Sequence, residues 1–258
     1  MNLMIFQQAL RTGRGGLIWY AIGGALIVVI GGLGLSLVNS QSAALEGVLK
    51  GLPPTVLRIF KINLVSFTTP VGYIAARSLN LLWPIMVIAF CAGSAGGVSA
   101  MLERGTIHFE LSLPVSRTQW LLSRIVAGLL GLLLICAVTV AALYLFTPAD
   151  WWRFLILGMA FGVLWLGVAF AVAAFARDRG RVMGVVFGLF AVEFLIATLA
   201  GVVGGAAWLR DWNLWSAYVP DETVLNGVPW GPVVLWTIIG LCAFGIALWR
   251  WRTRDLPA

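Results

Sequence analysis

Apolar residues in this chain gather into six long runs that short polar segments separate. Each run reaches about the 20 residues that an α-helix needs to cross the hydrocarbon core of a bilayer. The runs are Leu17–Val38, Leu79–Met101, Ala127–Phe146, Phe154–Ala176, Val182–Ala207 and Pro229–Trp249. We therefore expect an all-α membrane protein with one domain over residues 1–258, and with spans near 17–38, 79–101, 122–146, 154–176, 182–207 and 229–249.

The residues before the first run predict an amphipathic helix lying on the inner membrane surface. Leu3, Phe6 and Leu10 share one helical face, and glutamines and arginines surround it. A merely solvated terminus is the alternative, which the apolar stripe disfavours. The first run is too long for the core of a signal peptide, so we interpret it as a retained span.

Composition places the chain in a membrane. Hydrophobic residues make up 61% and charged residues 10% of the 258 residues, and mean hydropathy is +0.98. A soluble domain is about 45–50% apolar and about 25% charged. Tryptophan is also frequent, and most of the 13 lie near the ends of runs, which predicts an interfacial belt. Small-xxx-small pairs such as Gly158/Gly162 and Gly184/Gly188 predict close packing of helices within or between chains.

The basic residues predict which side of the membrane each loop faces. If both termini are cytoplasmic, 11 of the 17 basic residues fall in inner segments, as the positive-inside rule requires. These are Arg11, Arg14, Arg104, Arg117, Arg124, Arg177, Arg179, Arg181, Arg250, Arg252 and Arg254. Because they lie in short loops at the ends of spans, the net charge of +7 indicates topology, and we expect no nucleic-acid partner.

Catalytic and metal-binding patterns are missing from the sequence. Cys91, Cys136 and Cys242 all fall inside expected spans, and His108 is the only histidine, so neither a disulfide framework nor a zinc site is predicted. There is no nucleotide-binding P-loop and no HExxH motif. Ser99 has no intramembrane histidine to activate it. We expect no enzyme activity, no metal and no cofactor in this chain.

Glu193 is the one ionisable residue near the middle of an expected span. Ala197, Ala200, Gly201 and Gly204 share its helical face, so the side chain is expected to face protein or a cavity. Intramembrane carboxylates are functional candidates by default. A protonated glutamate that is hydrogen-bonded to a neighbouring helix is the equally weighted alternative. In the functional interpretation, Glu193 lines the path of the substrate.

The segment from Glu103 to Arg124 holds the densest polar chemistry and lies between the second and third runs. Pro114 lacks an amide hydrogen and disfavours helical geometry just before it, so a preceding helix ends there. Ser116-x-x-Gln119 fits a capping box that opens the next helix. The segment is expected to protrude between two spans.

A short helix is expected upstream of the proline, beginning near Gly105 and Thr106. Thr106 can cap it, and Glu110 would lie one turn in, near its positive end. The alternation of Ile107, Phe109, Leu111 and Leu113 conflicts with this helix, because it is the pattern of a strand. A lone strand beside a membrane would leave its edges unpaired, so the helix is preferred.

This segment resembles the signature E-x-G-T-L-E…L-L-x-x-P-V-S-R of type-2 exporter permeases of ATP-binding-cassette (ABC) transporters. The matching residues are Glu103-x-Gly105-Thr106-Ile107 and Leu111-Ser112-Leu113-Pro114-Val115-Ser116-Arg117. The order of six spans, a Pro-Val-Gly-Tyr sequence before the second and a basic end after the sixth extends the resemblance over essentially the whole chain. His108 stands where the family has an acidic residue, and Arg124 where lysine is common.

The resemblance implies that the segment is a coupling helix docking into a separate ATPase subunit. Its defining positions would be Glu103, Gly105, Thr106, Pro114 and Arg117, with His108 and Glu110 in the same docking region. ATP and magnesium would be bound by that ATPase, of which two copies would serve a homodimer of permeases; a second, different permease is the other option. The complex would contact membrane lipids in the bacterial cytoplasmic membrane.

The expected function is export of an amphipathic or hydrophobic substrate, such as a drug, an antibiotic peptide or a lipid-like molecule. Two other functions are open. A secondary transporter would use an ion gradient through Glu193, and it would work without an ATPase. A non-transporting immunity or recruitment protein would show no flux even with the ATPase present.

Overall fold

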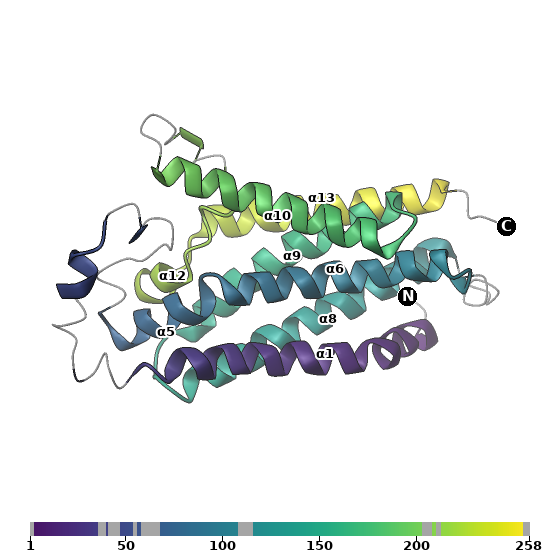
Figure 1. Ribbon diagram of the computed structural model, residues 1–258. Coiled ribbons are helices and arrows are strands. Elements are labelled where there is room, and N and C mark those ends of the chain that lie inside the picture. The colour runs from purple at the N-terminus through teal and green to yellow at the C-terminus, as the bar shows by residue number, and fades with distance from the viewer. Residues whose placement is uncertain are drawn as a thin grey trace.

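Long helices lie side by side in the computed structural model, which describes residues 3–35, 40, 47–53, 56–57, 68–107, 116–202, 208–209 and 213–254 (Figure 1). No strand occurs among these residues. The principal elements are α1 (Leu3–Gly32), α5 (Pro70–Leu79), α6 (Leu82–Glu103), α8 (Arg117–Tyr144), α9 (Trp151–Phe175), α10 (Arg179–Val202), α12 (Pro220–Asn226) and α13 (Trp230–Thr253).

Six helical stretches in the described residues are long and apolar enough to cross a membrane, which confirms the six expected spans as elements. Their boundaries differ from expectation at two places. The N-terminal amphipathic segment is no separate element, because α1 runs unbroken from Leu3 to Gly32 and no proline interrupts it. The second span begins early, since Thr69 caps α5 by accepting a 3.1 Å hydrogen bond from the amide of Gly72.

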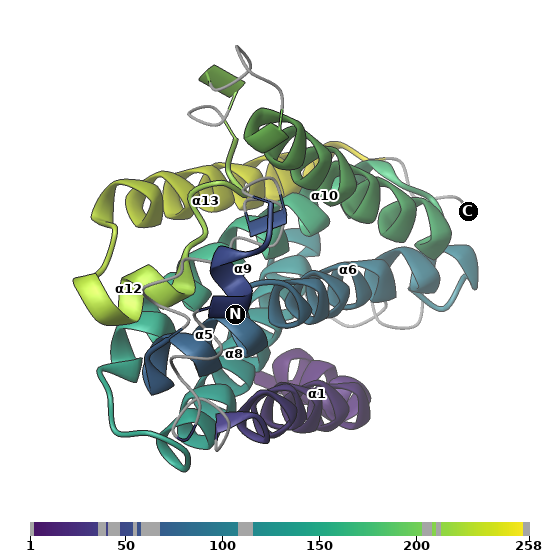
Figure 2. The same ribbon diagram turned by 60° about the vertical axis from the view of Figure 1, so that its left-hand side comes forward.

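Helix α9 is the centre of the bundle, where it contacts α6, α8, α10 and α13 (Figure 2). Its aromatic side chains Phe154, Phe161 and Phe170 are fully buried. The closest approach is to α13, because a Cβ at Gly167 would fall on the carbonyl of Gly240. Conversely, a Cβ at Gly240 would lie 2.6 Å from the carbonyl of Val163. Two facing glycines therefore let these backbones touch.

The glycine pairs expected from spacing divide into two groups. Gly158 and Gly162 do pack, against Trp83 and Leu132. A Cβ at Gly184 or at Gly188 would meet nothing within 4 Å. Spacing along one helix also could not reveal the contact between Gly167 and Gly240, which lie on different helices.

The expected tryptophan belt is wrong for several residues. Trp83, Trp120, Trp151 and Trp251 are fully buried, although they lie near the ends of helices. Trp83 donates from Nε1 to the Thr139 hydroxyl at 3.0 Å, and Trp151 donates to the carbonyl of Thr147 at 2.9 Å. Trp83 and Trp151 pack helices together because each combines a large apolar surface with one donor that finds a partner. The belt interpretation suits the exposed Trp19, Trp152, Trp208, Trp230 and Trp249.

Candidate functional site

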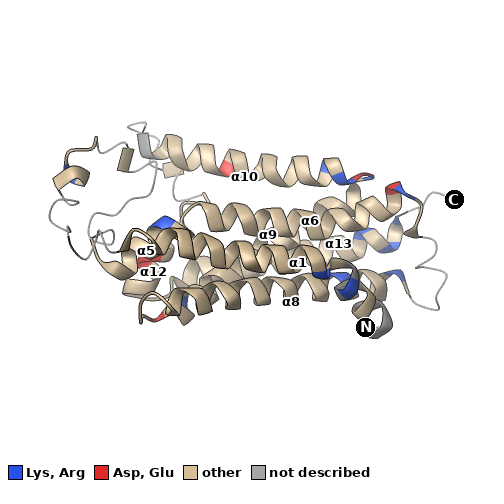
Figure 3. Ribbon diagram, turned by 60° about the horizontal axis from the view of Figure 1, so that its bottom comes forward, with Lys and Arg blue, Asp and Glu red and all other residues tan. Residues whose placement is uncertain are grey.

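All eleven arginines expected on the inner side lie at one end of the bundle (Figure 3). This end, called the arginine end below, combines the start of α1, the end of α6, the start of α8, the connection from α9 to α10 and the end of α13. Two helices flank the expected coupling segment. Helix α6 ends, and helix α8 begins, at the arginine end. The structure thus brings the basic residues and the borders of that segment together.

Helix α6 ends where the resemblance begins. Glu103 is its last residue, and Gly105 follows with a positive φ of 67°, a conformation that glycine adopts at low cost. The amides of Arg104 and Gly105 donate to the carbonyls of Ala100 and Leu102, at 3.1 and 3.2 Å. Gly105 therefore terminates α6, and Ile107, two residues further on, is again helical, in agreement with a helix that begins near Gly105 and Thr106.

Thr106 also serves the end of α6. Its hydroxyl donates to the carbonyl of Met101 at 3.4 Å, so it contacts one of the carbonyls that a helix end leaves without an intrahelical partner. Glu103 and Thr106 are exposed, and Ile107 is buried. The other expected docking residues, His108, Glu110 and Pro114, lie outside the described residues.

The start of α8 confirms the predicted capping box. The Ser116 hydroxyl accepts from the amide of Gln119 at 3.2 Å, and the Gln119 side chain accepts from the amide of Ser116 at 3.4 Å. Both bonds satisfy amides at the helix start that have no intrahelical partner. The helix therefore begins at a fixed residue, Arg117, directly after the expected coupling segment.

Arg117 does more than begin the helix. Its Nη1 donates to the backbone carbonyl of Arg254, just beyond α13, at 2.9 Å. The Arg254 guanidinium in turn donates to three carbonyls at the end of α9, those of Ala173, Ala174 and Ala176, at 3.1, 3.0 and 2.7 Å. Arg254 thus caps α9 from another helix. Burial lowers the pKa of the Arg254 guanidinium below its usual range, and the nearby charges of Arg250 and Arg177 act in the same direction.

Two tryptophans strengthen the same contact. Trp120 of α8 and Trp251 of α13 stack with ring centroids 5.5 Å apart and planes 10° from parallel. Arg124 lies over the Trp120 ring at 5.3 Å, and Arg254 over the Trp251 ring at 5.7 Å. We call the group of Arg117, Trp120, Trp251 and Arg254 the junction. It joins α8, α9 and α13 at the arginine end.

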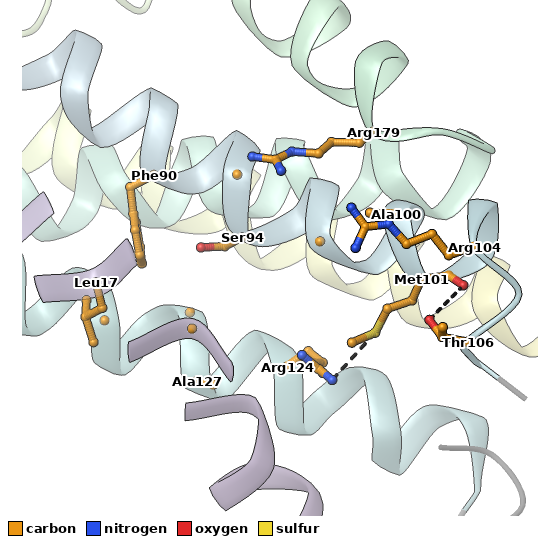
Figure 4. A pocket seen from close by; sticks show the side chains of 15 residues that line it. Leu17, Phe90, Ser94, Ala100, Met101, Arg104, Thr106, Arg124, Ala127 and Arg179 are labelled. Carbon is orange, nitrogen blue, oxygen red and sulfur yellow. Dashed lines mark hydrogen bonds between the residues drawn. The ribbon is translucent and has the colours of Figure 1, made fainter. Parts of the chain in front are cut away.

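A cavity of about 400 Å³ opens beside the junction (Figure 4). Its walls come from α1, α6, α8 and the start of α10. Arg104 and Arg179 reach into it from the side of α6, and Arg124 lies on the facing wall of α8. The rest of the lining consists of several glycines and of Leu17, Phe90, Ser94, Ala100, Met101, Thr106 and Ala127. No sequence pattern indicated this cavity, because its walls are far apart along the chain.

Glu193 lies on α10, away from the arginine end, and it is half-buried. Its Oε2 accepts from the amides of Leu214 and Trp215, at 3.0 and 3.4 Å, and its backbone carbonyl accepts from the Asn213 side chain at 2.8 Å. The carboxylate therefore accepts hydrogen bonds from the turn at residues 214–217, and not from a neighbouring helix as the alternative expected. A place on the substrate path stays a prediction.

The described residues contain no group of three or more His, Cys, Asp or Glu residues that could hold a metal ion. The sequence matches the family described as ABC-2 family transporter protein over residues 18–213, more than half of the chain. The chain belongs to this family. A search of curated proteins found no match. ABC-2 membrane components typically lack ATPase activity and generally pair with ATP-binding subunits, so ATP binding would lie in a partner ATPase.

Proposed function

We propose that this chain is the permease subunit of an ATP-driven exporter in the bacterial cytoplasmic membrane, with both termini in the cytoplasm. Two copies form the translocation unit, and two ATP-binding subunits dock at the arginine end. The residues at which docking occurs are Glu103 to Arg117. The substrate is amphipathic or hydrophobic, because the described residues form helices of membrane length and no soluble recognition domain.

The junction is the observation that supports this proposal. The docking segment follows the end of α6 at Gly105. It joins α8 at Ser116, the residue that caps that helix. The last residue of the segment, Arg117, donates a hydrogen bond to the carbonyl of Arg254 just beyond α13, and Trp120 stacks on Trp251 near the end of α13. A push on the segment therefore moves α8 directly, and it moves α9 and α13 through Arg254. Transport that is driven by another subunit needs a rigid connection of this kind.

Helix α10 supports a second permease chain as partner. Only 17% of its apolar span is buried within one chain, compared with 61% for α9. Val185, Leu189 and Val192 follow one another at helical spacing and are exposed, and Gly184 and Gly188 leave open space. Such a face can pack against the same face of a second copy in the bilayer. The alternative is that this face of α10 contacts lipid, in which case cysteines placed on it should not cross-link two chains.

Orientation follows from the clustering of arginines. Cytoplasmic loops carry an excess of Lys and Arg. Since the eleven arginines of the inner set lie at one end, that end is the cytoplasmic one in our proposal. An ATP-binding subunit, which needs cytoplasmic ATP, could then reach the segment that begins at Glu103.

The test is co-purification of the permease with the ATP-binding subunit that accompanies the wild-type chain. Glu103→Ala should reduce the recovered ATPase at least about tenfold while the permease still inserts and melts normally, because Glu103 is exposed. Arg117→Ala should reduce export as well, since it removes the bond to Arg254. Arg252→Ala is the control, because Arg252 is exposed at the same end and outside the junction. Full association and export in both test variants would show that docking occurs elsewhere.

A further inference from the structure

We infer that the cavity at the arginine end binds an anionic amphiphile, with a phosphate-type head at the arginines and an apolar tail along α1 and α8. A membrane phospholipid is the source that its position favours. The site needs no ATPase, and it lies beside the junction instead of within it. The inference therefore stands or falls separately from the coupling proposal.

The basic residues of the cavity lining are the first observation that supports an anionic ligand. Arg104, Arg124 and Arg179 come from three different helix ends, and no residue in the described lining is acidic. The like charges of Arg104 and Arg179 face the same space, and an anion between them offsets their repulsion. The guanidinium fork also matches the oxygens of a phosphate, which accepts paired hydrogen bonds from it.

Local structure directs Arg179 into the cavity. The adjacent Asp178 is already engaged, because its carboxylate accepts from the Arg181 amide at 2.8 Å and pairs with the Arg181 guanidinium at 2.9 Å. The stem of Arg179 crosses α6 at Gly96, where a Cβ would come within 3.1 Å of its Cγ. Figure 4 shows its guanidinium extending toward the middle of the space, as does that of Arg104.

The apolar residues of the lining are the second observation, and they support an apolar tail on the ligand. Leu17 of α1, Phe90 of α6 and Ala127 of α8 continue the cavity away from the arginines. Tyr20 meets the edge of Phe90, with ring centroids 5.5 Å apart, which fixes this wall. A free inorganic anion would leave this part empty, whereas an acyl chain would fill it and gain the free energy of apolar contact.

Size and location agree with a lipid headgroup. About 400 Å³ lies within the range of about 300–1,000 Å³ that is typical of small-molecule sites. Basic pockets between transmembrane helices at the membrane surface bind anionic lipid heads. The cavity fits that description because it lies between α1, α6 and α8, at the level where the arginines gather.

The experiment is native mass spectrometry of the purified full-length chain in an uncharged detergent. Phosphatidylglycerol and phosphatidylcholine with identical tails are offered separately, and inorganic phosphate is offered as competitor. We expect phosphatidylglycerol to be retained at least about tenfold better than phosphatidylcholine, since charge-assisted bonds to the arginines are lost with a neutral head. Equal retention of the two lipids would overturn the inference. Full displacement by phosphate at millimolar concentration would overturn the role of the tail.

Two pairs of variants locate the binding. The double substitution Arg104→Gln and Arg179→Gln should abolish the preference for phosphatidylglycerol, and Arg252→Gln, exposed at the same end but outside the lining, should keep it. Gly97→Leu should reduce retention, because Gly97 lines the cavity and a Cβ there meets nothing within 4 Å. Gly245→Leu is its match, in open space on α13. Melting temperatures verify folding, and an unchanged preference in the double variant would overturn the inference.

Discussion

The side chain of Arg117 donates to the backbone carbonyl of Arg254 at 2.9 Å, across 137 residues of sequence. Arg254 also supplies the donors for the last carbonyls of α9. The first residue of the third span is therefore bonded to the residue that follows the sixth and caps the fourth. Three spans meet directly beside the segment at which we place the ATPase.

Arg254→Ala should destabilise the protein. The substitution leaves the carbonyls of Ala173, Ala174 and Ala176 without their charged donor in a buried site, which costs about 1.5–3 kcal/mol of unfolding free energy. Unfolding by a denaturing detergent measures this change. Arg252→Ala, which alters an exposed arginine two residues away, should leave the unfolding free energy nearly unchanged. Equal stability of the two variants would show that the cap contributes little.

Gly240→Ala should weaken the contact between α9 and α13. The added Cβ would lie 2.6 Å from the carbonyl of Val163, and a backbone atom cannot rotate away. Overpacking of this kind costs about 1–3 kcal/mol. Gly245→Ala is the matched control on the same helix, where nothing lies within 4 Å. The measurement is the melting temperature of each variant in detergent, and a clear decrease is expected only for Gly240→Ala.

Glu193 can be tested by two substitutions that separate its possible roles. Glu193→Gln keeps an oxygen that accepts from the Leu214 amide, so stability should change little. Glu193→Ala removes that acceptor and should lower the unfolding free energy by about 1–3 kcal/mol. Export by the stable Gln variant then decides the substrate-path hypothesis. Normal export means that the charge is not required, and lost export in a stable protein means that it is.

Reaction with a membrane-impermeant maleimide should reveal the orientation. Arg252→Cys, in a Cys242→Ser background, places a thiol at the exposed arginine end, and the remaining Cys91 and Cys136 are buried. We expect labelling in inside-out vesicles and none in intact cells. Trp230→Cys reports on the start of α13, at the opposite end, and should show the reverse pattern. The opposite result for both would place the arginine end outside and remove the docking site from the reach of cytoplasmic ATP.

Cross-linking should distinguish a second permease from lipid on α10. Leu189→Cys, again with Cys242→Ser, should form a disulfide-linked dimer on mild oxidation in membranes, because our proposal places this face against its copy. Leu241→Cys on α13 is the control with a comparably exposed apolar side chain. Equal, weak cross-linking at both positions would indicate that α10 faces lipid.

Features governed by neighbouring residues could be predicted from the sequence. The six spans follow from the length of apolar runs, and the capping box follows from Ser116 and Gln119, which lie three residues apart. The early start of the second span was not predicted, because the sequence stretch before it contains Pro70. Pro70 occupies the first turn of α5, where its missing amide hydrogen costs nothing.

Features that depend on distant residues had no sequence signal. Arg254 looked like one more basic residue after a span, and only the fold shows it bonded to the end of α9. The sequence predicted an interfacial position for both Trp120 and Trp251, whereas the structure shows the two rings stacked on each other. For the same reason, the sequence placed Arg104, Arg124 and Arg179 on one side of the membrane, but it could not predict that the three line one cavity.

The stacked rings of Trp120 and Trp251 also provide an intrinsic spectroscopic probe of the distance between α8 and α13. Two indoles held nearly parallel at 5.5 Å are close enough for their electronic transitions to couple, and this coupling produces a paired circular-dichroism signal. Sliding α8 past α13 would separate the chromophores and weaken that signal. Nucleotide-driven movement could then be followed in real time without attaching a dye.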